Sequence, residues 1–492
     1  MSTKRKLLVA LGVFLLVIGG FAWFLMRGTP AQKSLDQLSG REPQLVRPKA
    51  ESFPSIGIAK PIGWAAGETP KAAQGLGVVR FAEGLNHPRV MLTLPNGDVV
   101  VAEADAPEGS MGGGLTAWIG SMLMKRAGAK VKSPDALILL RDGDGDGRAE
   151  QKFTLRQGNG LASPSGLAWR DDTLYVANHN AVLSFPYKLG ETTLASAPKK
   201  LMDLPAGGNH WMRNVLLSAD GTRLFVAVGS ASNIAEKGIE LEKGRAAIWE
   251  LNLKTGYPRQ YAQGLRNPNG MDWNPSSGEL WTVVNERDQL GPDLVPDYLT
   301  NVPIGAHYGW PWVYWKNNDD DRVNNSAPPE YFDDYVRKPE FALGAHVAPL
   351  GMAFVKGGEK LGPAFANGAV IARHGSWNRK PLSGYDVVFV AFDANGNPQG
   401  LPVPLLTGFL VDGKSETRGR PTWVSFARDG ALLVSDDTAG IIWRVMAAGA
   451  APAATVKPVV TARMPPQREL KGDPDDEARY KAGFKDDQKV AQ

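Results

Sequence analysis

One pattern recurs six times along this 492-residue chain: an apolar alternating strand, a turn containing Gly, Asp or Asn, and a second strand. Period-two alternation around turn pairs such as Asn96-Gly97 and Asp429-Gly430 predicts a β-hairpin at each place. The copies begin 49 to 81 residues apart, at or beyond the length of about 40–50 residues expected for a propeller blade. The pattern therefore favours an all-β fold, a six-bladed β-propeller, over a pair of β-sandwiches. The six hairpins are expected at residues 90–103, 166–178, 215–228, 270–286, 351–375 and 424–437.

The composition supports many turns and excludes several classes of protein. Gly (56 residues) and Pro (36) are both abundant. The 55 basic and 51 acidic residues are too nearly balanced for a nucleic-acid-binding surface. The chain contains no cysteine, which excludes disulfides, thiolate metal sites, thiol nucleophiles and a covalently attached c-type haem.

The N-terminal end predicts a membrane anchor. Residues 7–26 form an uncharged, nearly all-apolar run of 20 residues after Lys4, Arg5 and Lys6, which is long enough to span a bilayer as a helix. Because a small-x-small cleavage site is poorly matched, we interpret this run as an uncleaved signal anchor rather than a cleaved signal peptide. The expected topology is a single pass through the inner membrane, with the main domain in the periplasm. The expected parts are a cytoplasmic tail (1–6), the transmembrane helix (7–26), a linker (27–75), the propeller (76–446) and a mostly disordered tail (447–492).

Two segments within the propeller have distinctive sequences. Residues 108–131 combine helical apolar spacing with basic residues near the end, which indicates a helix that either packs on its own domain or rests on a membrane surface. The run that begins at Asp142 and continues through Asp144 and Asp146 matches the first half of a calcium loop. The closing Glu is missing, because Phe153 stands at the twelfth position, so a tight Gly-rich turn is the alternative.

The usual motifs of hydrolases and nucleotide-binding proteins are missing: the sequence has no H-E-x-x-H pair, no phosphate-binding Gly-rich loop and no G-x-S-x-G. Arginine, histidine and asparagine gather instead where the hairpins begin. In a propeller these positions converge on one end of the central channel. Arginines that lie together without acids indicate an anionic ligand, and guanidinium forks suit carboxylates. The alternative is that each arginine pairs with an acid of a neighbouring blade.

Several motifs that occur in order resemble a known family. They are GNHWMRN (208–214, preceded by Gly207), GLRNPNGM (264–271), VNERDQLGPDLVPDYLT (284–300), HYGWPW (307–312), HGSWNRKPLSGYDVVFV (374–390) and RGRP (418–421). Together they resemble the L-sorbosone dehydrogenase-like and pyranose dehydrogenase-like proteins, relatives of soluble quinoprotein glucose dehydrogenase. The resemblance covers about residues 75–446. It implies a six-bladed propeller that binds pyrroloquinoline quinone (PQQ) and Ca²⁺ and oxidises aldoses or related sugars by hydride transfer.

The resemblance also implies roles for individual residues. His210 matches the catalytic base that takes the hydroxyl proton of the sugar, a role that suits histidine because its pKa lies near neutrality. Arg266 matches the arginine beside the reacting quinone carbonyl, and Arg418 and Arg420 match the pair that holds PQQ carboxylates. The calcium site would lie in the segment 286–292, which offers Glu286 and Asp288 as metal ligands. The further cofactor contacts that it implies are Arg89, Asn267, His346, Trp377, Asn378 and Arg379, with Lys380 as the alternative to Arg379.

The sequence departs from the family in two respects. The glucose enzyme has a substrate-binding Gln before its second blade, where Asn159 is the nearest counterpart here, so glucose itself is in doubt. Some relatives carry a fused cytochrome, and a chain without cysteine has no such domain, so electrons would pass to a separate quinone or cytochrome c. Two other functions stay open: a propeller lactonase or similar metal hydrolase, which needs acidic metal ligands at the channel, and a non-catalytic binding scaffold.

Overall fold

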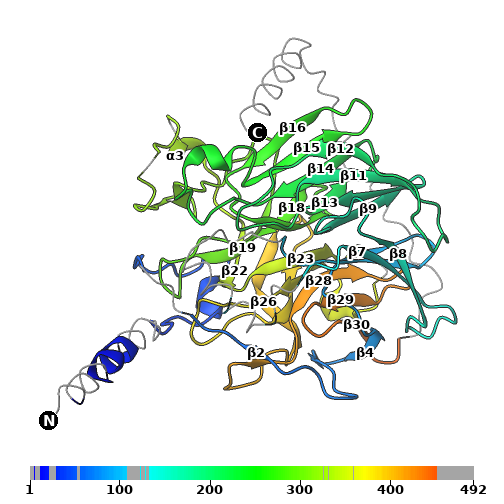
Figure 1. Ribbon diagram of the computed structural model, residues 1–492, viewed down its shortest axis with the longest axis horizontal. Helices are drawn as coiled ribbons and strands as arrows, with labels where there is room; N and C mark the ends of the chain where they lie inside the picture. Colours follow the sequence, from blue (N-terminus) through cyan, green and yellow to red (C-terminus); the bar gives the residue numbers. More distant parts are fainter. Residues whose placement is uncertain are drawn as a thin grey trace.

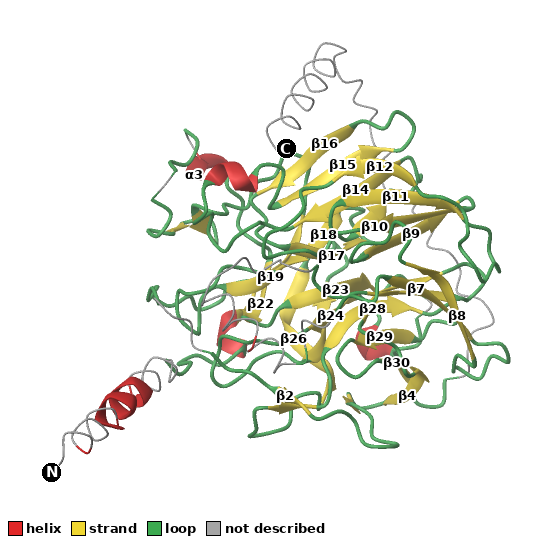
Figure 2. Cartoon of the chain, in the orientation of Figure 1, coloured by secondary structure: helices red, strands yellow, loops and turns green. Residues whose placement is uncertain are grey.

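The computed structural model describes residues 29–51, 56–107, 132–324, 326–330, 332–357 and 359–450, together with residues 5, 12–20, 122 and 128. Its strands form six antiparallel sheets of four or five strands each, and two small two-stranded pairs (Figures 1 and 2). Each large sheet is one blade. The six-bladed, all-β propeller predicted from the sequence is confirmed.

The blades follow one another along the chain. Blade 1 contains β5 (Pro88–Thr93), β6 (Val99–Glu103), β7 (Ala136–Arg141) and β8 (Gln151–Gln157). Blade 2 contains β9 (Gly166–Arg170), β10 (Thr173–Ala177), β11 (Ala181–Pro186) and β12 (Lys199–Asp203). Blade 3 contains β13 (Val215–Leu217), β14 (Arg223–Val228), β15 (Ala247–Asn252) and β16 (Pro258–Gln263).

The last three blades each recruit a strand from the N-terminal part of the chain. Blade 4 contains β17 (Pro268–Trp273), β18 (Leu280–Val284), β19 (Pro296–Asn301), β22 (Phe341–Ala345) and β1 (Ser39–Gly40). Blade 5 contains β23 (Pro349–Phe354), β24 (Gly368–Arg373), β25 (Asp386–Phe392), β26 (Pro398–Thr407) and β3 (Lys71–Ala72). Blade 6 contains β28 (Pro421–Phe426), β29 (Leu432–Asp436), β30 (Ile441–Ala447) and β4 (Leu76–Ala82).

The remaining elements lie in the connections. They are the strand pairs β2 (Lys60–Pro61) with β27 (Glu416–Thr417) and β20 (Val313–Tyr314) with β21 (Asn318–Asp319), the 3-10 helices η1 (Asp36–Leu38), η2 (Ile239–Glu242) and η3 (Pro363–Phe365), and the short helix α3 (Phe332–Tyr335).

Each predicted hairpin corresponds to the two inner strands of one blade. The innermost strands β5, β9, β13, β17, β23 and β28 contact one another in that order, and β28 returns to β5, so the ring is closed. The core lies between neighbouring blades. Between blades 4 and 5, for example, the rings of Trp281 and Phe354 both pack edge-on against Phe392, with centroids 5.0 Å apart in each case. Such contacts between large buried rings fix the angle between adjacent sheets.

The ring is closed by a strand from the opposite end of the chain. Strand β4 pairs antiparallel with β30, with Val78 opposite Val445 and Arg80 opposite Trp443. In Figure 1 the blue strand β4 accordingly lies beside the orange strand β30. One sheet thus holds both ends of the propeller, and the outer edge of β30 is covered instead of being left free to pair with another chain.

The segment expected to be a linker, residues 27–75, contributes to the propeller surface wherever the structure describes it. Its strands β1 and β3 extend blades 4 and 5, and β2 pairs with β27. Leu38 is fully buried, and the Trp64 ring packs edge-on against Phe409 and Trp443. A few separate apolar side chains in this Pro-rich segment are thus enough to bind it to the blades. The composition of the segment alone does not reveal these contacts.

The expected transmembrane run is described only at residues 12–20, which are helical. Within the described part of the chain, no helix has both the length and the apolar character needed to cross a membrane. The rest of that run, nearly all of residues 108–131, and residues 451–492 of the expected C-terminal tail lie outside the described residues.

Candidate active site at one end of the channel

The polar residues singled out in the sequence lie at one rim of the propeller because of strand direction. In each blade the innermost strand runs antiparallel to the second strand, as β13 does to β14, so the start of the first and the end of the second share a rim. Arg89, His210 and Arg266 lie at or just before the starts of innermost strands. Asp288 and Asn378 follow the ends of second strands. The topology thus brings together residues from four blades.

A chain of contacts joins blades 3, 1 and 6. The guanidinium of Arg89 lies 5.4 Å from the ring centre of Trp211, the residue after His210. The same guanidinium forms an ion pair with Asp437 at the end of β29. The same carboxylate oxygen of Asp437 accepts a hydrogen bond from His374 Nε2, at 2.9 Å. His374 follows β24, so this path reaches blade 5.

A second chain of contacts joins blades 3, 4 and 5. Arg266 donates to the Asp288 carboxylate at 3.0 Å, and Asn378 donates to the other oxygen of that carboxylate at 2.7 Å. The Asn378 amide also lies 3.2 Å from His346 Nδ1. Asn233, which sequence reasoning missed, accepts from both the Arg266 side chain and the Asp288 backbone amide. The first chain of contacts starts before β13 and the second after β14, and both end in the segment that follows β24 in blade 5.

Gly229 lies between His210 and Asn267, and its lack of a side chain leaves room for both. A Cβ at position 229 would lie 2.3 Å from Asn267 Oδ1 and 2.6 Å from His210 Cβ, so any larger residue would push the two side chains apart. Asn267 Oδ1 is buried and accepts no hydrogen bond from any residue that the structure describes. A buried carbonyl oxygen without a donor is costly, so a donor from a bound molecule would satisfy it.

The protonation of His210 follows from its partners. Nδ1 lies 2.9 Å from the Ser230 carbonyl oxygen, which can only accept, so Nδ1 carries the proton and Nε2 has a free lone pair. Burial, together with the charge of nearby Arg266, lowers the pKa of His210 well below 6.5. At neutral pH the imidazole is therefore uncharged, and Nε2, which has no partner within the described chain, can accept a proton.

A buried carboxylate fixes the loop that holds His210. Ser230 Oγ donates to the Ser232 carbonyl, and Ser232 Oγ and the Ala231 amide both donate to Glu242 in η2. Burial raises the pKa of Glu242, while these two hydrogen bonds favour its charged form. This support could not be predicted, because in the sequence a Glu between two strands resembles any surface acid.

The arginines do not form the uncompensated cationic group expected from the sequence. The expectation that they lack acidic partners was wrong, because four ion pairs account for most of them: Arg89 pairs with Asp437, Arg266 with Asp288, Arg379 with Asp293 and Arg418 with Glu68. The acids lie between 22 and 350 residues away along the chain, so none of them stands beside its arginine in the sequence. Arg420 alone among these arginines has no carboxylate within ion-pair distance in the described chain; it donates to the His374 and Gly375 carbonyls and lies over the Tyr385 ring.

Three of the expected cofactor contacts lie outside the connected group. The Arg379 guanidinium is buried and donates to Asp293 and to the Lys33 carbonyl, so it anchors the N-terminal segment. Arg418 contacts Glu68 and the Trp64 ring. Trp377 is 41% exposed. His346 and Asn378, in contrast, are buried within the connected group.

The two expected metal ligands are engaged by arginines. Glu286 accepts from Arg287 Nε at 3.0 Å, and both oxygens of Asp288 are occupied as described above. A separate acidic cluster lies in the turn between β7 and β8, where the ligand atoms of Asp142, Asp144, Asp146 and Glu150 lie within 4.8 Å of one another. Glu150 supplies the fourth carboxylate that the calcium-loop pattern lacked. Four backbone amides of the turn donate to the three aspartates, as expected of a tight Gly-rich turn.

Known proteins with similar sequences include dehydrogenases that depend on pyrroloquinoline quinone. A 30% identical, uncharacterized protein of Borreliella burgdorferi aligns over 58% of this chain and 76% of its own length. The pyrroloquinoline quinone-dependent pyranose dehydrogenase of Coprinopsis cinerea is 27% identical, over 48% of this chain and only 39% of that enzyme. The pyrroloquinoline quinone-dependent sugar dehydrogenase of Hypocrea jecorina is 25% identical, over 56% of this chain and 73% of that enzyme.

Solved structures support the fold. A Trichoderma reesei protein of Carbohydrate-Active Enzymes Family AA12 superposes with a TM-score of 0.62 at 22% identity, over 77% of this chain and 98% of the other. The PQQ domain of Coprinopsis cinerea pyranose dehydrogenase gives a TM-score of 0.60 at 21% identity, over 79% of this chain and all of that domain (100%). Fold and site thus define a six-bladed propeller with a polar, histidine-containing end to its channel. The chain belongs to the TrAA12-like family, whose model matches residues 136–301 and 318–448.

Proposed function

We propose that this protein is a PQQ-dependent dehydrogenase of aldoses or related sugars, including sorbosone-like carbonyl sugars. The observation that carries the proposal is the neutral His210, whose Nε2 has no partner in the described chain and which lies with the unsatisfied Asn267 against Gly229. Two relatives named as PQQ-dependent sugar dehydrogenases support it. A membrane anchor, a periplasmic location and a separate quinone or cytochrome c acceptor complete the proposal on the sequence grounds given above.

The residues at this end of the channel fit a polar, anionic cofactor. Arg420 forms no ion pair in the described chain, Asn267 Oδ1 lacks a donor, and Gly229, without a Cβ, leaves room for both His210 and Asn267 beside it. Arg420 and Asn267 would hold the cofactor, and Arg266 would keep a positive charge nearby while Asp288 and Asn233 fix its orientation. PQQ, when bound, supplies the acceptor for the two electrons of the sugar's C–H bond.

His210 Nε2 would accept the proton of the sugar hydroxyl while a hydride leaves the carbon that bears this hydroxyl. The proton at Nδ1 stays hydrogen-bonded to the Ser230 carbonyl, which stabilises the imidazolium that forms. Burial makes the neutral form the resting state, so the base is ready at neutral pH. The chain thus supplies the proton acceptor and its orientation.

The proposal is tested by adding PQQ and Ca²⁺ to the purified full-length protein. The absorption spectrum of bound PQQ should appear, and dye reduction should follow with at least one member of a sugar panel. Calcium is tested separately by chelation, because a cation at Asp288 would compete with Arg266 for the carboxylate. Absence of PQQ binding at micromolar cofactor would contradict the proposal.

A non-catalytic scaffold is the second candidate, since arginines paired with acids are also what a purely structural rim would contain. PQQ binding without turnover of any sugar would favour it. A metal hydrolase is less well supported, because Glu286 and Asp288 are engaged by arginines. Hydrolysis of a sugar lactone in the absence of PQQ would favour that function instead.

The pH dependence of turnover reports on His210. Because its pKa lies well below 6.5, the imidazole stays neutral as the pH falls from 7 through 6.5. We expect kcat/KM of the reconstituted enzyme to be flat across that range and to fall only at lower pH, as His210 becomes protonated. A loss of activity centred at pH 6.5 or above would show that the base is exposed to water or is another group.

Replacing Glu242 with Gln tests the support of His210. The Gln side chain keeps the shape of Glu but lacks the carboxylate that accepts hydrogen bonds from Ser232 Oγ and the Ala231 backbone amide. We expect kcat to fall about tenfold with KM little changed, because the loop that carries the Ser230 carbonyl loosens. The acid limb of the pH profile should also move to lower pH, since the Ser230 hydrogen bond favours the charged imidazole. Glu83→Gln, at an exposed position just after β4, is the control.

A further inference from the structure

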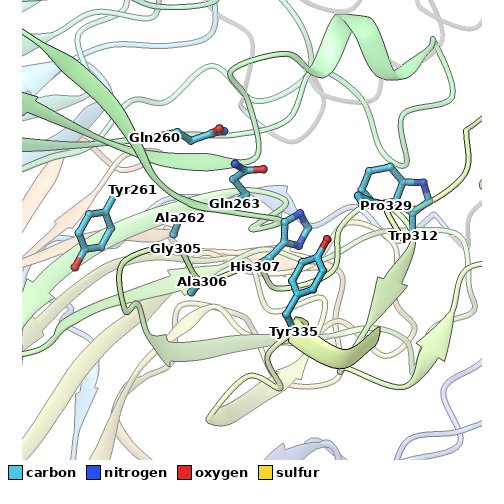
Figure 3. A pocket seen from close by; sticks show the side chains of 10 residues that line it. All are labelled: Gln260, Tyr261, Ala262, Gln263, Gly305, Ala306, His307, Trp312, Pro329 and Tyr335. Carbon is cyan, nitrogen blue, oxygen red and sulfur yellow. The ribbon is translucent and has the colours of Figure 1, made fainter. Parts of the chain in front are cut away.

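A cavity of about 280 Å³ lies away from the channel, on the outer side of blade 3. It opens at the seam between β16, the outermost strand of blade 3, and the insertion of residues 302–340 that blade 4 carries between β19 and β22 (Figure 3). Its walls are formed by Gln260, Tyr261, Ala262, Gln263, Gly305, Ala306, His307, Trp312, Pro329 and Tyr335.

The floor of the cavity is held by backbone hydrogen bonds between the two blades. The Gln263 amide donates to the Ala306 carbonyl at 2.9 Å, and the Tyr308 amide donates to the Gln263 carbonyl at 3.0 Å. The Gly305 amide donates to the Tyr261 carbonyl at 2.8 Å. The insertion therefore covers the edge of β16 as an additional strand would, and the small residues at this seam leave the space above it open.

Three polar groups of the lining have no protein partner in the described chain: His307 Nε2 and the side-chain amides of Gln260 and Gln263. His307 Nδ1 accepts from the Gly309 amide at 3.0 Å, so its proton is on Nε2. Burial lowers the pKa of His307 to about 4, which keeps the ring neutral. The lining thus offers donors and acceptors to a ligand but no charged side chain at neutral pH.

Three aromatic rings of the lining are fixed by a fourth ring behind them. The buried Phe332 packs edge-on against His307, Trp312 and Tyr335, with centroids 4.8, 5.2 and 5.4 Å apart. The indole nitrogen of Trp312 is used by Ser326, at 3.1 Å from its carbonyl oxygen. Tyr335 is nonetheless 47% exposed. In Figure 3 Gln263, His307 and Tyr335 lie on one side and Trp312 with Pro329 on the other. Rings held in place at an open cavity form a preorganised binding surface.

We propose that this cavity binds one neutral sugar ring as a second saccharide site, separate from the channel. A pyranose has an apolar C–H face, which suits the aromatic rings, and a rim of hydroxyl groups that both donate and accept, which suits the amides and His307 Nε2. An anion would meet no cationic side chain in the lining, and a cation would meet no carboxylate. The volume is at the lower end for ligand pockets, which fits a single ring.

The test uses methyl β-D-glucopyranoside and methyl β-D-xylopyranoside with the full-length protein in the absence of PQQ. Blocking the anomeric oxygen and omitting the cofactor make the result independent of the proposed dehydrogenase activity. Saturation-transfer NMR should show binding of at least one glycoside, with a Kd of about 1 mM because the site is half open and holds one ring. Tetramethylammonium, the probe for a cation-binding aromatic cage, should not compete.

Two variants and a matched control locate the binding. Gln263→Leu should weaken binding about fivefold through the loss of hydrogen bonds, and Tyr335→Ala about fivefold through the loss of a stacking ring. Gln157 ends the outermost strand of blade 1 as Gln263 ends that of blade 3, and it is exposed, so Gln157→Leu should leave affinity unchanged. The proposal is overturned by no glycoside binding up to tens of millimolar, by equal binding to all variants, or by competition from tetramethylammonium. Failure of PQQ-dependent activity would leave this result unaffected.

Discussion

His210→Ala should abolish nearly all sugar oxidation while PQQ still binds. The neutral imidazole has a free Nε2 lone pair and lies with Asn267 against Gly229. In contrast, the Nε2 of His374 donates to Asp437, and both ring nitrogens of His346 contact Asn378 or a backbone carbonyl. Removing a general base costs about 10²–10⁴-fold in rate. We expect kcat/KM for dye reduction to fall by that factor, with the PQQ Kd, measured by absorption titration, changed by less than about threefold.

The matched control for His210→Ala is His179→Ala. His179 is a half-buried histidine that follows the second strand of blade 2, and it is not among the residues assigned to the site. That variant should retain turnover close to that of the unchanged protein. Loss of PQQ binding in His210→Ala with normal turnover by the remaining bound fraction would show that His210 holds the cofactor rather than moving the proton.

Asp437→Asn should cause the largest loss of stability among the substitutions considered. The carboxylate is 5% exposed and accepts from Arg89 and His374, so its neutralisation leaves the buried Arg89 guanidinium without a counter-charge. Breaking a buried pair of this kind costs about 3–5 kcal/mol in the free energy of unfolding. Urea unfolding at neutral pH measures the effect. Asp146→Asn, an exposed acid in the turn of blade 1, should change stability by less than about 0.5 kcal/mol.

The pH dependence of that loss has a defined sign. Burial alone would raise the pKa of Asp437, but His374 and Arg89 hold it well below 3.8. A carboxyl whose pKa is lower in the folded than in the unfolded state stabilises the fold above the unfolded pKa and loses that contribution as the pH falls below it. The stability difference between the unchanged protein and Asp437→Asn should therefore be constant down to about pH 4 and shrink below that. A difference that was small at neutral pH would contradict the assigned ion pair.

The number of blades and the position of their inner strands could be predicted from the sequence because alternation and turn pairs are local signals. Residues 215–228 and 424–437, for example, form the expected hairpins of blades 3 and 6. The contribution of β4 to blade 6 could not be predicted in the same way, since its partner β30 lies more than 350 residues further along the chain. Pairing across such a distance depends on ring closure, to which no local pattern corresponds.

The sequence allowed the position of the candidate site to be predicted, but not most of the contacts between its residues. His210, Asn267, His346 and Asn378 lie close to the channel end because the start of each hairpin shares one rim. Their acidic partners could not be assigned, since Asp437 and Asp288 follow second strands and an acid after a strand most often ends a turn. The balance of charge at the rim is therefore a property of the assembled ring, and not of any motif.

The seam between β4 and β30 also limits the order in which the protein can be made. Strand β4 is synthesised before any complete blade and must wait for β30, the last strand of the propeller, before its backbone hydrogen bonds can form. When five blades have been synthesised, the nascent chain is therefore an open ring, and the apolar faces of its first and last blades are both exposed. The ring closes only after β30 has been synthesised. Premature termination before β30 would therefore release an open fragment that is prone to aggregate.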